Sequence, residues 1–562
     1  MKKYLLYLVS VSFVGLSITL MRGIKPVSAK GQRPQFASDR LLVKYRSEVE
    51  DLEIERDIAA RVLPSGRAEA ESLRTGHLGK FYLVKLPQGA SVEEAASRLS
   101  RSPAVEYAEP DYFLYPADTT PDDPLFGMEW GMFNTGAQPP GGKAGADINA
   151  PKAWDITTGS DDVVVGITDT GVDITHPDLS PNIWVNPHEI AGNGVDDDGN
   201  GFIDDVNGWN FFDNNNRVFD PVNDQGFQGG HGTHVSGTIG AVGNNSVGVA
   251  GVAWHVKLMI LKFIGRQDDG TFMGATSDAI KAINYAVAQR QRGTNIKVIN
   301  ASWAGTKNAM ALHDAIDAAG KAGITFVCAA GNAQGPGLNN DIADSALYPA
   351  AWSDISSLIS VAAVDDQDNL AFFSYYGHQT VGVGAPGVGI MSTLPNNSYG
   401  QNTGTSMATP HVAGIAVLLA AHEPALTPAQ IIQRIITTSK PVLTLASKAI
   451  GSGRADAFNA LTNQTAGPGS PQIAAVTTNK KWITVDGIGF RNGSAIVEAG
   501  GTALGNAVYD SSFVLANGTI TELSVKLGKA LMRSTFPSGV PVQVTVFNPT
   551  TGERSQAFTY TK

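Results

Sequence analysis

Between residues 119 and 463, the chain alternates uniformly apolar segments with amphipathic ones. The apolar segments read DVVVGITD, VKLMILKFIG, KVINASW, ITFVCAAGN and LISVAAV, and stretches such as GATSDAIKAINYAVAQRQ lie between several of them. Strands that are apolar along their whole length are buried on both faces, which is typical of parallel sheets with crossover helices. The pattern therefore predicts an α/β domain whose parallel β-sheet is covered by helices on both faces. In such sheets, sites form at the carboxyl ends of the strands.

Different patterns flank this domain. From residue 30 to 118, the strand-like segments RLLVKYR, KFYLVKLP and AVEYAEPDYFLYP accompany the helix-like SVEEAASRL, which opens with capping-box spacing at Ser91 and Glu94. These segments predict a small α/β unit. A linker is expected at 464–472. Beyond it, at 473–562, segments such as WITVDGIGF and VPVQVTVFN alternate with a period of two and predict a β-sandwich.

The first 29 residues indicate the compartment. Lys2 and Lys3 precede an apolar run, and the small residues of VSA at 27–29 follow it at the spacing of a cleavage site. This is the pattern of a secretory signal peptide. An uncleaved anchor helix is the alternative, because the apolar run is rather long. We therefore expect a secreted protein without stable membrane insertion after removal of the signal.

Charge and cysteine content narrow the function classes. The formal net charge is −11 and no long Lys/Arg stripe occurs, so a nucleic-acid partner is not expected. The single cysteine, Cys328, excludes an internal disulfide. It lies in the apolar run ITFVCAAG, which indicates a buried, inert residue rather than a nucleophile. An exported chain without disulfides needs another source of rigidity, and bound calcium is one candidate.

Three segments of the α/β domain place polar side chains at strand ends or helix starts. Asp169 ends the strand-like VVVGITD, His231 opens HGTHVSGTIGA, and Ser406 lies at the start of an apolar helix. A serine nucleophile needs a base to take its proton, and a histidine oriented by a buried aspartate provides one. Asn332 in AAGN follows a strand, where its amide could stabilise an oxyanion together with the Ser406 backbone N–H.

The segments ITDTGVD, HGTHVSGTIG, CAAGN and GTSMATPHVAG resemble the signature blocks of the subtilisin-like serine proteases (subtilases, peptidase family S8), in that family's order of Asp, His and Ser. The resemblance covers roughly residues 150–460. It implies a subtilisin-like fold that hydrolyses protein or peptide substrates. It also implies a catalytic triad of Asp169, His231 and Ser406, with Asn332 in the oxyanion hole.

The resemblance extends to other parts of the chain. Segments similar to those that pair with substrate and form the wall of the S1 pocket contain Ser302, Trp303, Ala304, Gly305, Ala329, Ala330 and Gly331. Ala304 departs from the family pattern, which has glycine there. The segment 30–118 resembles the family's propeptide, which assists folding and then inhibits the enzyme, and 473–562 is similar to a TIG-type immunoglobulin-like domain. We expect a monomeric preproenzyme that removes its own propeptide.

The acidic segment NGVDDDGNGFIDDVNGW is similar to a calcium-binding loop. Its spacing matches positions one, three, five and six of the EF-hand loop, whereas Asn207 replaces the bidentate glutamate at position twelve. The expected calcium ligands are Asp196, Asp198, Asn200, the carbonyl of Phe202, and Asp204 or Asp205. A solvated acidic loop is the alternative.

A second calcium site is implied only by the family resemblance. Its ligands would be Asp178, Asn245 and loop carbonyls that include those of Val247 and Val249. This loop is one residue longer than in the family pattern. The sequence therefore leaves two alternatives for one further ligand, the carbonyl of Val242 or that of Gly243. An ordinary Asn-rich turn is the alternative.

Three other functions compete with a serine protease. A zinc hydrolase would use His231 and His234, although helical zinc pairs usually lie at i and i+4 with an intervening glutamate; otherwise His234 is a buried, hydrogen-bonded helix residue. An α/β-hydrolase needs its histidine after the serine, and only His411 and His422 follow Ser406. A catalytically inactive subtilase-fold protein would act in binding or adhesion instead.

Overall fold

The computed structural model describes residues 36–62, 69–73, 80–86, 90–112, 118–137, 141–467, 469–505, 507–508 and 513–562. The expected signal peptide at 1–29 lies outside these residues. The chain divides into two compact units, Met1–Tyr115 and Pro116–Lys562. Within the described part of the chain, no helix is both long and apolar enough to cross a membrane.

The N-terminal unit is a four-stranded antiparallel sheet with two helices, in the strand order β2-β3-β1-β4. Its elements are β1 (Phe36–Tyr45), α1 (Asp51–Val62), β2 (Glu69–Ser72), β3 (Lys80–Lys85), α2 (Val92–Leu99) and β4 (Val105–Tyr112). The predicted cap of α2 is present, because the N–H of Glu94 donates to Ser91 Oγ. Helix α1 was not predicted, because its apolar stripe is narrow: Ile54, Ile58 and Val62 are its buried residues.

A nine-stranded sheet forms the centre of the second unit, and its parallel strands confirm the predicted α/β fold. In spatial order the strands are β16 (Lys440–Pro441), β17 (Gly453–Arg454), β13 (Val383–Pro386), β12 (Leu358–Val364), β11 (Thr325–Ala329), β10 (Ile296–Ala301), β5 (Gly159–Asp169), β7 (His255–Lys262) and β6 (Gly208–Asn210). The pairing is parallel throughout except between β16 and β17.

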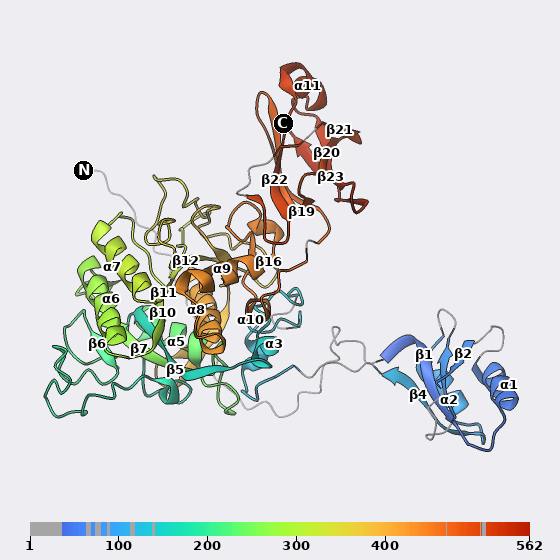
Figure 1. Cartoon of the computed structure of the whole chain (residues 1–562), viewed down its shortest axis with the longest axis horizontal. Coiled ribbons are helices and arrows are strands. Elements are labelled where there is room, and N and C mark those ends of the chain that lie inside the picture. The colour runs from blue at the N-terminus through green and yellow to red at the C-terminus, as the bar shows by residue number, and fades with distance from the viewer. Residues whose placement is uncertain are drawn as a thin grey trace, which may run out of the picture. The chain divides into compact units, whose positions relative to one another are not determined.

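Helices cover both faces of this sheet (Figure 1). One face packs against α6 (Thr276–Gln291) and α7 (Met310–Lys321); the other packs against α5 (His231–Gly240), α8 (Thr405–His422) and α9 (Pro428–Thr438). Successive residues of a strand point to opposite faces. Val165 and Ile167 of β5 accordingly join the core beneath α5 and α8, whereas Val164 joins the core beneath α6 and α7.

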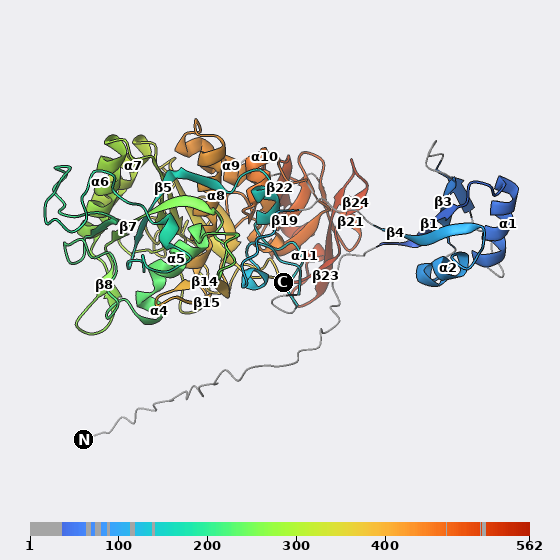
Figure 2. The same cartoon turned by 90° about the horizontal axis from the view of Figure 1, so that it is seen from below.

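Short elements complete this part of the chain. They are α3 (Ala150–Trp154), α4 (Gly226–Gly229), α10 (Ala457–Thr462), the 3-10 turns Phe126–Met128, Ser180–Asn182 and Leu443–Leu445, and two hairpins. The hairpins are β8 (Gly265–Arg266) with β9 (Phe272–Met273), and β14 (Ile390–Leu394) with β15 (Ser398–Asn402). The β14–β15 hairpin lies beside α5 (Figure 2).

The C-terminal part forms two antiparallel sheets around one apolar core, as the period-two pattern predicted. One sheet contains β18 (Gln472–Thr478), β19 (Trp482–Arg491) and β22 (Thr519–Lys526); the other contains β20 (Ile496–Ala499), β21 (Thr502–Ala503), β23 (Pro541–Asn548), β24 (Glu553–Arg554) and β25 (Phe558–Thr561). Two details differ from the sequence analysis. Strand β18 begins inside the expected linker, and α11 (Gly528–Thr535) interrupts the strands, with Met532 buried in the core.

Candidate active site

The predicted residues lie at the carboxyl ends of three neighbouring parallel strands in the middle of the sheet. Asp169 is the last residue of β5, Ser302 directly follows β10, and Ala329 ends β11. On the face packed against α5 and α8, His231 is the first residue of α5 and Ser406 the second residue of α8. The topology therefore gathers groups that lie far apart in the sequence.

Asp169 and His231 form a hydrogen-bonded pair. His231 Nδ1 lies 2.7 Å from Asp169 Oδ1; the Asp169 side chain is fully buried, and that of His231 is 17% exposed. Burial lowers the pKa of His231, whereas the charge of Asp169 and its hydrogen bond raise it, and the net direction of the pKa is upward. Because Nδ1 donates to Asp169, Nε2 is the ring atom that can accept a proton.

The glycines around His231 permit a close approach of the helix start to β5. A Cβ on Gly232 would lie 2.4 Å from the carbonyl oxygen of Gly171 and 3.2 Å from Asp169 Oδ1. The N–H of Gly232 donates to Thr170 Oγ1 (3.0 Å). Only a residue without a side chain fits at position 232.

His234 is separate from this pair. It is fully buried, and its Nε2 donates to the carbonyl oxygens of Ile390 (2.9 Å) and Gly400 (3.2 Å) in the β14–β15 hairpin. Burial lowers the pKa of His234 to about 3. The prediction of a buried, hydrogen-bonded helix residue is confirmed. Because the two histidines bind different partners, the arrangement does not favour a zinc site.

Ser406 and Asn332 face a common space. Ser406 Oγ donates to the carbonyl oxygen of Ser302 (3.0 Å). Asn332 Oδ1 accepts hydrogen bonds from the backbone N–H (2.9 Å) and the hydroxyl (3.0 Å) of Thr405. A Cβ placed on Gly404 would lie 3.4 Å from Asn332 Nδ2 and 3.6 Å from the backbone nitrogen of Ser406. Two N–H donors thus flank one space beside Ser406.

The predicted substrate-binding segments adjoin this space. Ser302 Oγ donates to the carbonyl oxygen of Ser406 (2.9 Å), and the N–H of Gly331 donates to Thr405 Oγ1 (3.2 Å). Ala329 and Ala330 are buried, and a Cβ on Gly331 would lie 2.3 Å from Leu347 Cδ1. Gly331 has a φ of 112°, which favours glycine.

The segment from Ser302 to Gly305 differs from its expected role at one end. Trp303 Nε1 donates to the carbonyl oxygen of Thr168 (3.0 Å), and Ala304 is exposed. The N–H and carbonyl of Gly305, however, are both hydrogen-bonded to Tyr348, at 2.7 and 2.8 Å. Because the N–H of Gly305 already donates to Tyr348, it is not available to pair with a substrate strand.

Two other reactive residues are inaccessible. Cys328 is fully buried in β11, and burial raises the pKa of its thiol, so it does not act as a nucleophile. His411 is buried in α8, where its Nδ1 donates to the carbonyl oxygen of Met407 (2.8 Å), and burial lowers its pKa to about 4. Because the ring of His411 is bound within the helix that carries Ser406, the α/β-hydrolase arrangement is not favoured.

The acidic loop brings together some of the expected calcium ligands. Carboxylate oxygens of Glu189, Asp198 and Asp205 lie within 4.8 Å of one another. Asn200 Nδ2 donates to Asp198 (3.1 Å) and to Asp205 (2.8 Å). Glu189 was missed, because it precedes the loop motif and only the fold places it beside Asp198. Glu189 Oε2 is buried without a hydrogen-bond partner among the described residues, which fits a site for a cation.

Asp196 does not join this cluster, contrary to the expectation from the loop pattern, and of the alternatives Asp204 and Asp205 the cluster contains Asp205. The carboxylate of Asp196 accepts the N–H groups of Asn200 and Gly201. That of Asp204 accepts backbone N–H groups of the segment 192–194. Both carboxylates therefore bind backbone N–H groups of the loop itself. The ring of Phe202 packs edge-on against three aromatic residues, Trp209, Phe211 and Tyr285.

The residues of the second expected calcium site lie together. Asp178 is buried and accepts hydrogen bonds from Asn245 Nδ2 and from the N–H of Val249, both at 2.9 Å; Asn245 Oδ1 accepts the N–H of Val247 (2.7 Å). Burial raises the pKa of Asp178 to about 6. Asp123, which binds the N–H groups of residues 244 and 245, was not predicted. It lies far upstream in the sequence, in a segment without regular structure.

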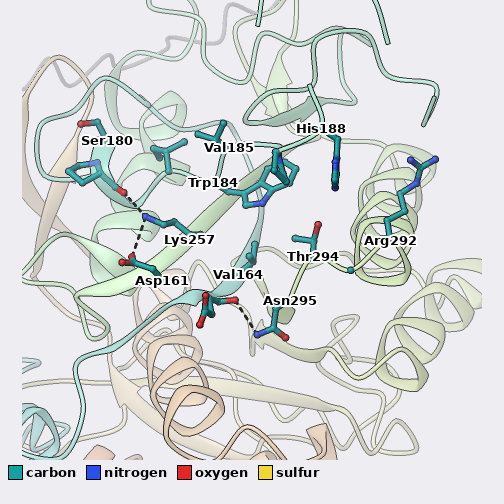
Figure 3. A pocket seen from close by; sticks show the side chains of 15 residues that line it. Asp161, Val164, Ser180, Trp184, Val185, His188, Lys257, Arg292, Thr294 and Asn295 are labelled. Atoms are coloured by element: carbon teal, nitrogen blue, oxygen red, sulfur yellow. Dashed lines mark hydrogen bonds and ion pairs between the residues drawn. The ribbon is translucent and has the colours of Figure 1, made fainter. Parts of the chain in front are cut away.

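A cleft of about 890 Å³, lined by both polar and apolar residues, lies at the opposite end of the parallel strands (Figure 3). It is lined by the starts of β5 and β7 and by the segment before β10. Lys257 Nζ donates to the carbonyl oxygen of Pro181 (2.8 Å) and lies 3.2 Å from Asp161 Oδ1. None of the predicted catalytic residues lines this cleft, so its size does not indicate the site of the chemistry.

Comparisons with known proteins match both units. A model of the subtilase family matches residues 160–471, and a model of the fervidolysin N-terminal prodomain matches residues 23–111. The thermophilic serine proteinase of Bacillus sp. (strain AK1) is 32% identical over 398 residues, covering 71% of this chain and 81% of that protein. Thermitase of Thermoactinomyces vulgaris is 36% identical over 301 residues, covering 54% and 85%. The solved structure of a protease from Pseudoalteromonas arctica PAMC 21717 is 31% identical, covers 62% of this chain and all of its own, and has a TM-score of 0.47.

Proposed function

Because the chain belongs to the subtilase family and is a serine endopeptidase with an N-terminal prodomain, we propose that Asp169, His231 and Ser406 are its catalytic triad and that Asn332 is its oxyanion-hole donor. The observation that supports this most directly is the 2.7 Å hydrogen bond between Asp169 and His231. It lies at the same end of the strands as the start of α8, whose second residue is Ser406. A catalytically inactive protein would have no chemical need for this pair.

The proposed reaction begins when the Ser406 hydroxyl turns from the Ser302 carbonyl toward His231. Ser406 Oγ attacks the scissile carbonyl carbon while His231 Nε2 takes its proton, and Asp169 stabilises the imidazolium. The carbonyl oxygen becomes an oxyanion, to which Asn332 Nδ2 and the Ser406 N–H donate. His231 then returns the proton to the leaving amine, and water releases the acyl group by the same sequence of steps.

The substrate backbone is proposed to lie along the segments that adjoin Ser406. These are Ser302, Trp303, Ala304, Ala329, Ala330 and Gly331. Because the N–H and carbonyl of Gly305 are paired with Tyr348, we propose that Trp303 and Ala304 supply the backbone groups of the first segment that bind substrate.

The chain is further proposed to be secreted as a monomeric preproenzyme. The signal peptide would be removed after residue 29, and the segment 30–118 would inhibit the enzyme until its own active site cleaves it. The 473–562 part is proposed to be a TIG-type domain. N-terminal sequencing of the secreted product, with a casein assay, tests this account: it predicts a new N-terminus at about 110–125 and casein cleavage. A product that starts at residue 30 and is inactive would contradict it.

Two substitutions in the oxyanion space are expected to lower kcat with little change in KM. Asn332→Ala removes one donor, which typically costs about 10²- to 10³-fold in kcat. Gly404→Ala places a methyl group between Asn332 Nδ2 and the Ser406 N–H, yet all its contacts are 3.4 Å or longer, so the melting temperature should change little. Gly335→Ala, where a Cβ meets nothing within 4 Å, is the control. Wild-type kcat in Asn332→Ala would exclude the assignment.

Calcium is proposed as a structural ion at both acidic sites. At the first, Glu189, Asp198, Asn200 and Asp205 would supply the ligands; at the second, Asp178 and Asn245 would supply them together with loop carbonyls such as those of Val247 and Val249. Clustered carboxylates repel one another in the absence of a cation. Oxygen-rich sites of this kind suit calcium, which would stabilise the folded chain without taking part in catalysis.

Chelation is therefore expected to lower the melting temperature of the mature enzyme. At a free calcium concentration about 100-fold above Kd, a single site contributes about 2.7 kcal/mol to the free energy of unfolding. Differential scanning calorimetry with EDTA, and then with excess calcium or magnesium, measures the effect. Asp205→Asn should reduce the shift on chelation, whereas exposed Asp344→Asn should leave it intact. An unchanged melting temperature on chelation would refute calcium binding.

A further inference from the structure

A buried ion pair, formed by Lys262 and Asp224, contacts the segments that carry Asp169 and His231. Lys262 is the last residue of β7, and Asp224 lies just before α4. Lys262 Nζ is 2.5 Å from Asp224 Oδ1, and the two side chains are 3% and 1% exposed. Taking two charges out of water is costly and rarely repaid in stability alone. The position of this pair therefore calls for a reason other than stability.

Lys262 holds the segment that carries Asp169. Its Nζ also donates to the carbonyl oxygen of Thr170 (2.8 Å), the residue after Asp169. The N–H of Thr170 donates in turn to Asp169 Oδ1 (2.7 Å), the oxygen that binds His231. The next residue of the chain, Phe263, donates its N–H to the carbonyl oxygen of Asp169 (3.1 Å). Lys262 thus restrains Thr170, whose N–H orients the Asp169 carboxylate.

Asp224 holds the segment that leads into His231. Its Oδ2 accepts the N–H of Asp220 (2.7 Å), and its own N–H donates to the Asp220 carbonyl oxygen (2.8 Å). A Cβ on Gly229 would lie 2.4 Å from the carbonyl carbon of Asp224, so the turn α4 packs tightly against it. The carbonyl oxygen of Gly229 accepts the Thr170 hydroxyl (3.0 Å). The ion pair therefore ties the end of β5 to the entry of α5.

We propose that Lys262 and Asp224 are positioning residues, whose ion pair holds Asp169 and His231 at the separation that their hydrogen bond requires. This inference rests on the proposed triad. The two residues act through Thr170 and the α4 turn, and not through the substrate. Because a misplacement of about 1 Å in an active site costs about 100-fold in rate, a restraint on this separation affects kcat directly.

The test compares two buried ion pairs. Lys262→Met/Asp224→Asn removes both charges and leaves neither one unpaired. The matched control is Arg454→Met/Asp368→Asn. The side chains of Arg454 and Asp368 are 1% and 7% exposed. Arg454 donates to the carbonyl oxygens of Gly145 and Asp147. Asp368 pairs with Lys143, and its carbonyl oxygen accepts the Thr444 hydroxyl. None of these contacts involves the end of β5 or α5. The single variant Asp224→Asn keeps the shape of the side chain and serves if the double variant does not fold.

Three readouts separate positioning from stability: kcat per titrated active site, KM, and the NMR resonance of the His231 Nδ1 proton. Lys262→Met/Asp224→Asn is expected to lower kcat about 10- to 100-fold with little change in KM. The downfield Nδ1 proton should move upfield as its hydrogen bond weakens, and Asp224→Asn should show the same changes to a smaller extent. In Arg454→Met/Asp368→Asn the melting temperature should fall, whereas kcat and the His231 Nδ1 resonance should stay as in the wild type.

Equal kcat per titrated site in the two double variants, or an unchanged Nδ1 resonance in Lys262→Met/Asp224→Asn, would overturn the proposal. The catalytic assignment is tested separately by Ser406→Ala. If Ser406→Ala remained active, the proposed triad would be wrong whatever the ion-pair variants do. If Ser406→Ala is inactive and the Lys262 variants turn over normally, the triad stands and only the positioning role is refuted.

Discussion

Replacing Ser406 by alanine is expected to abolish peptide-bond hydrolysis and to leave the chain as an unprocessed precursor. The variant loses the only atom that the proposed mechanism uses to attack the substrate, so kcat should fall about 10⁶-fold. A residual acceleration over the uncatalysed reaction is expected, because the oxyanion donors and the substrate-binding segments remain. The fold should be unaffected, because among the described residues the hydroxyl makes a single hydrogen bond, to the carbonyl oxygen of Ser302.

Casein cleavage and the size of the secreted chain measure this prediction. Ser353→Ala is the control, because Ser353 is exposed and lies outside the segments around Ser406. It should mature and cleave casein as the wild type does. A Ser406→Ala chain that processes itself normally and retains activity would refute the assignment.

The two histidines of HGTH are expected to respond differently to substitution. His231→Ala removes the base and should lower kcat about 10⁶-fold, as for the serine, because the two residues act as a unit. His234→Ala should preserve most of kcat, because its ring binds the carbonyls of Ile390 and Gly400 and stays uncharged. It removes a buried hydrogen bond and leaves a cavity, so the free energy of unfolding should fall by about 3 kcal/mol.

Kinetics with a peptide substrate and calorimetry on the same preparations separate the two effects. The expected pattern is a folded, inactive His231→Ala and an active, less stable His234→Ala. Equal losses of activity, together with equal losses of a bound metal, would favour the zinc alternative instead.

The sequence was sufficient for the parts of the site that are set by regular structure. Asp169 and Ala329 could be placed because buried parallel strands are recognisable as apolar runs and end at one edge of the sheet. His231 and Ser406 could be placed because their helices begin at glycine-rich and apolar segments. The family resemblance then supplied their proposed roles.

Residues that act from irregular segments were not found in this way. Glu189 and Asp123 reach the acidic sites only through the tertiary fold, and no local pattern marks them. Asp196 and Asp204 fit the loop pattern, but backbone N–H groups compete for their carboxylates. Lys262 did carry a signal: a lysine within the apolar run VKLMILKFIG has to find a buried partner. No pattern in the sequence identifies that partner as Asp224.

The most direct test of the catalytic assignment is covalent labelling by diisopropyl fluorophosphate, which phosphorylates a serine whose hydroxyl is activated by a neighbouring base. Mass spectrometry of the digested protein should locate the label on Ser406 in the wild-type enzyme, with parallel loss of activity. The label should be absent from folded His231→Ala, in which the base is missing. A label on a different serine, or an enzyme that cleaves casein and takes up no label, would contradict the account.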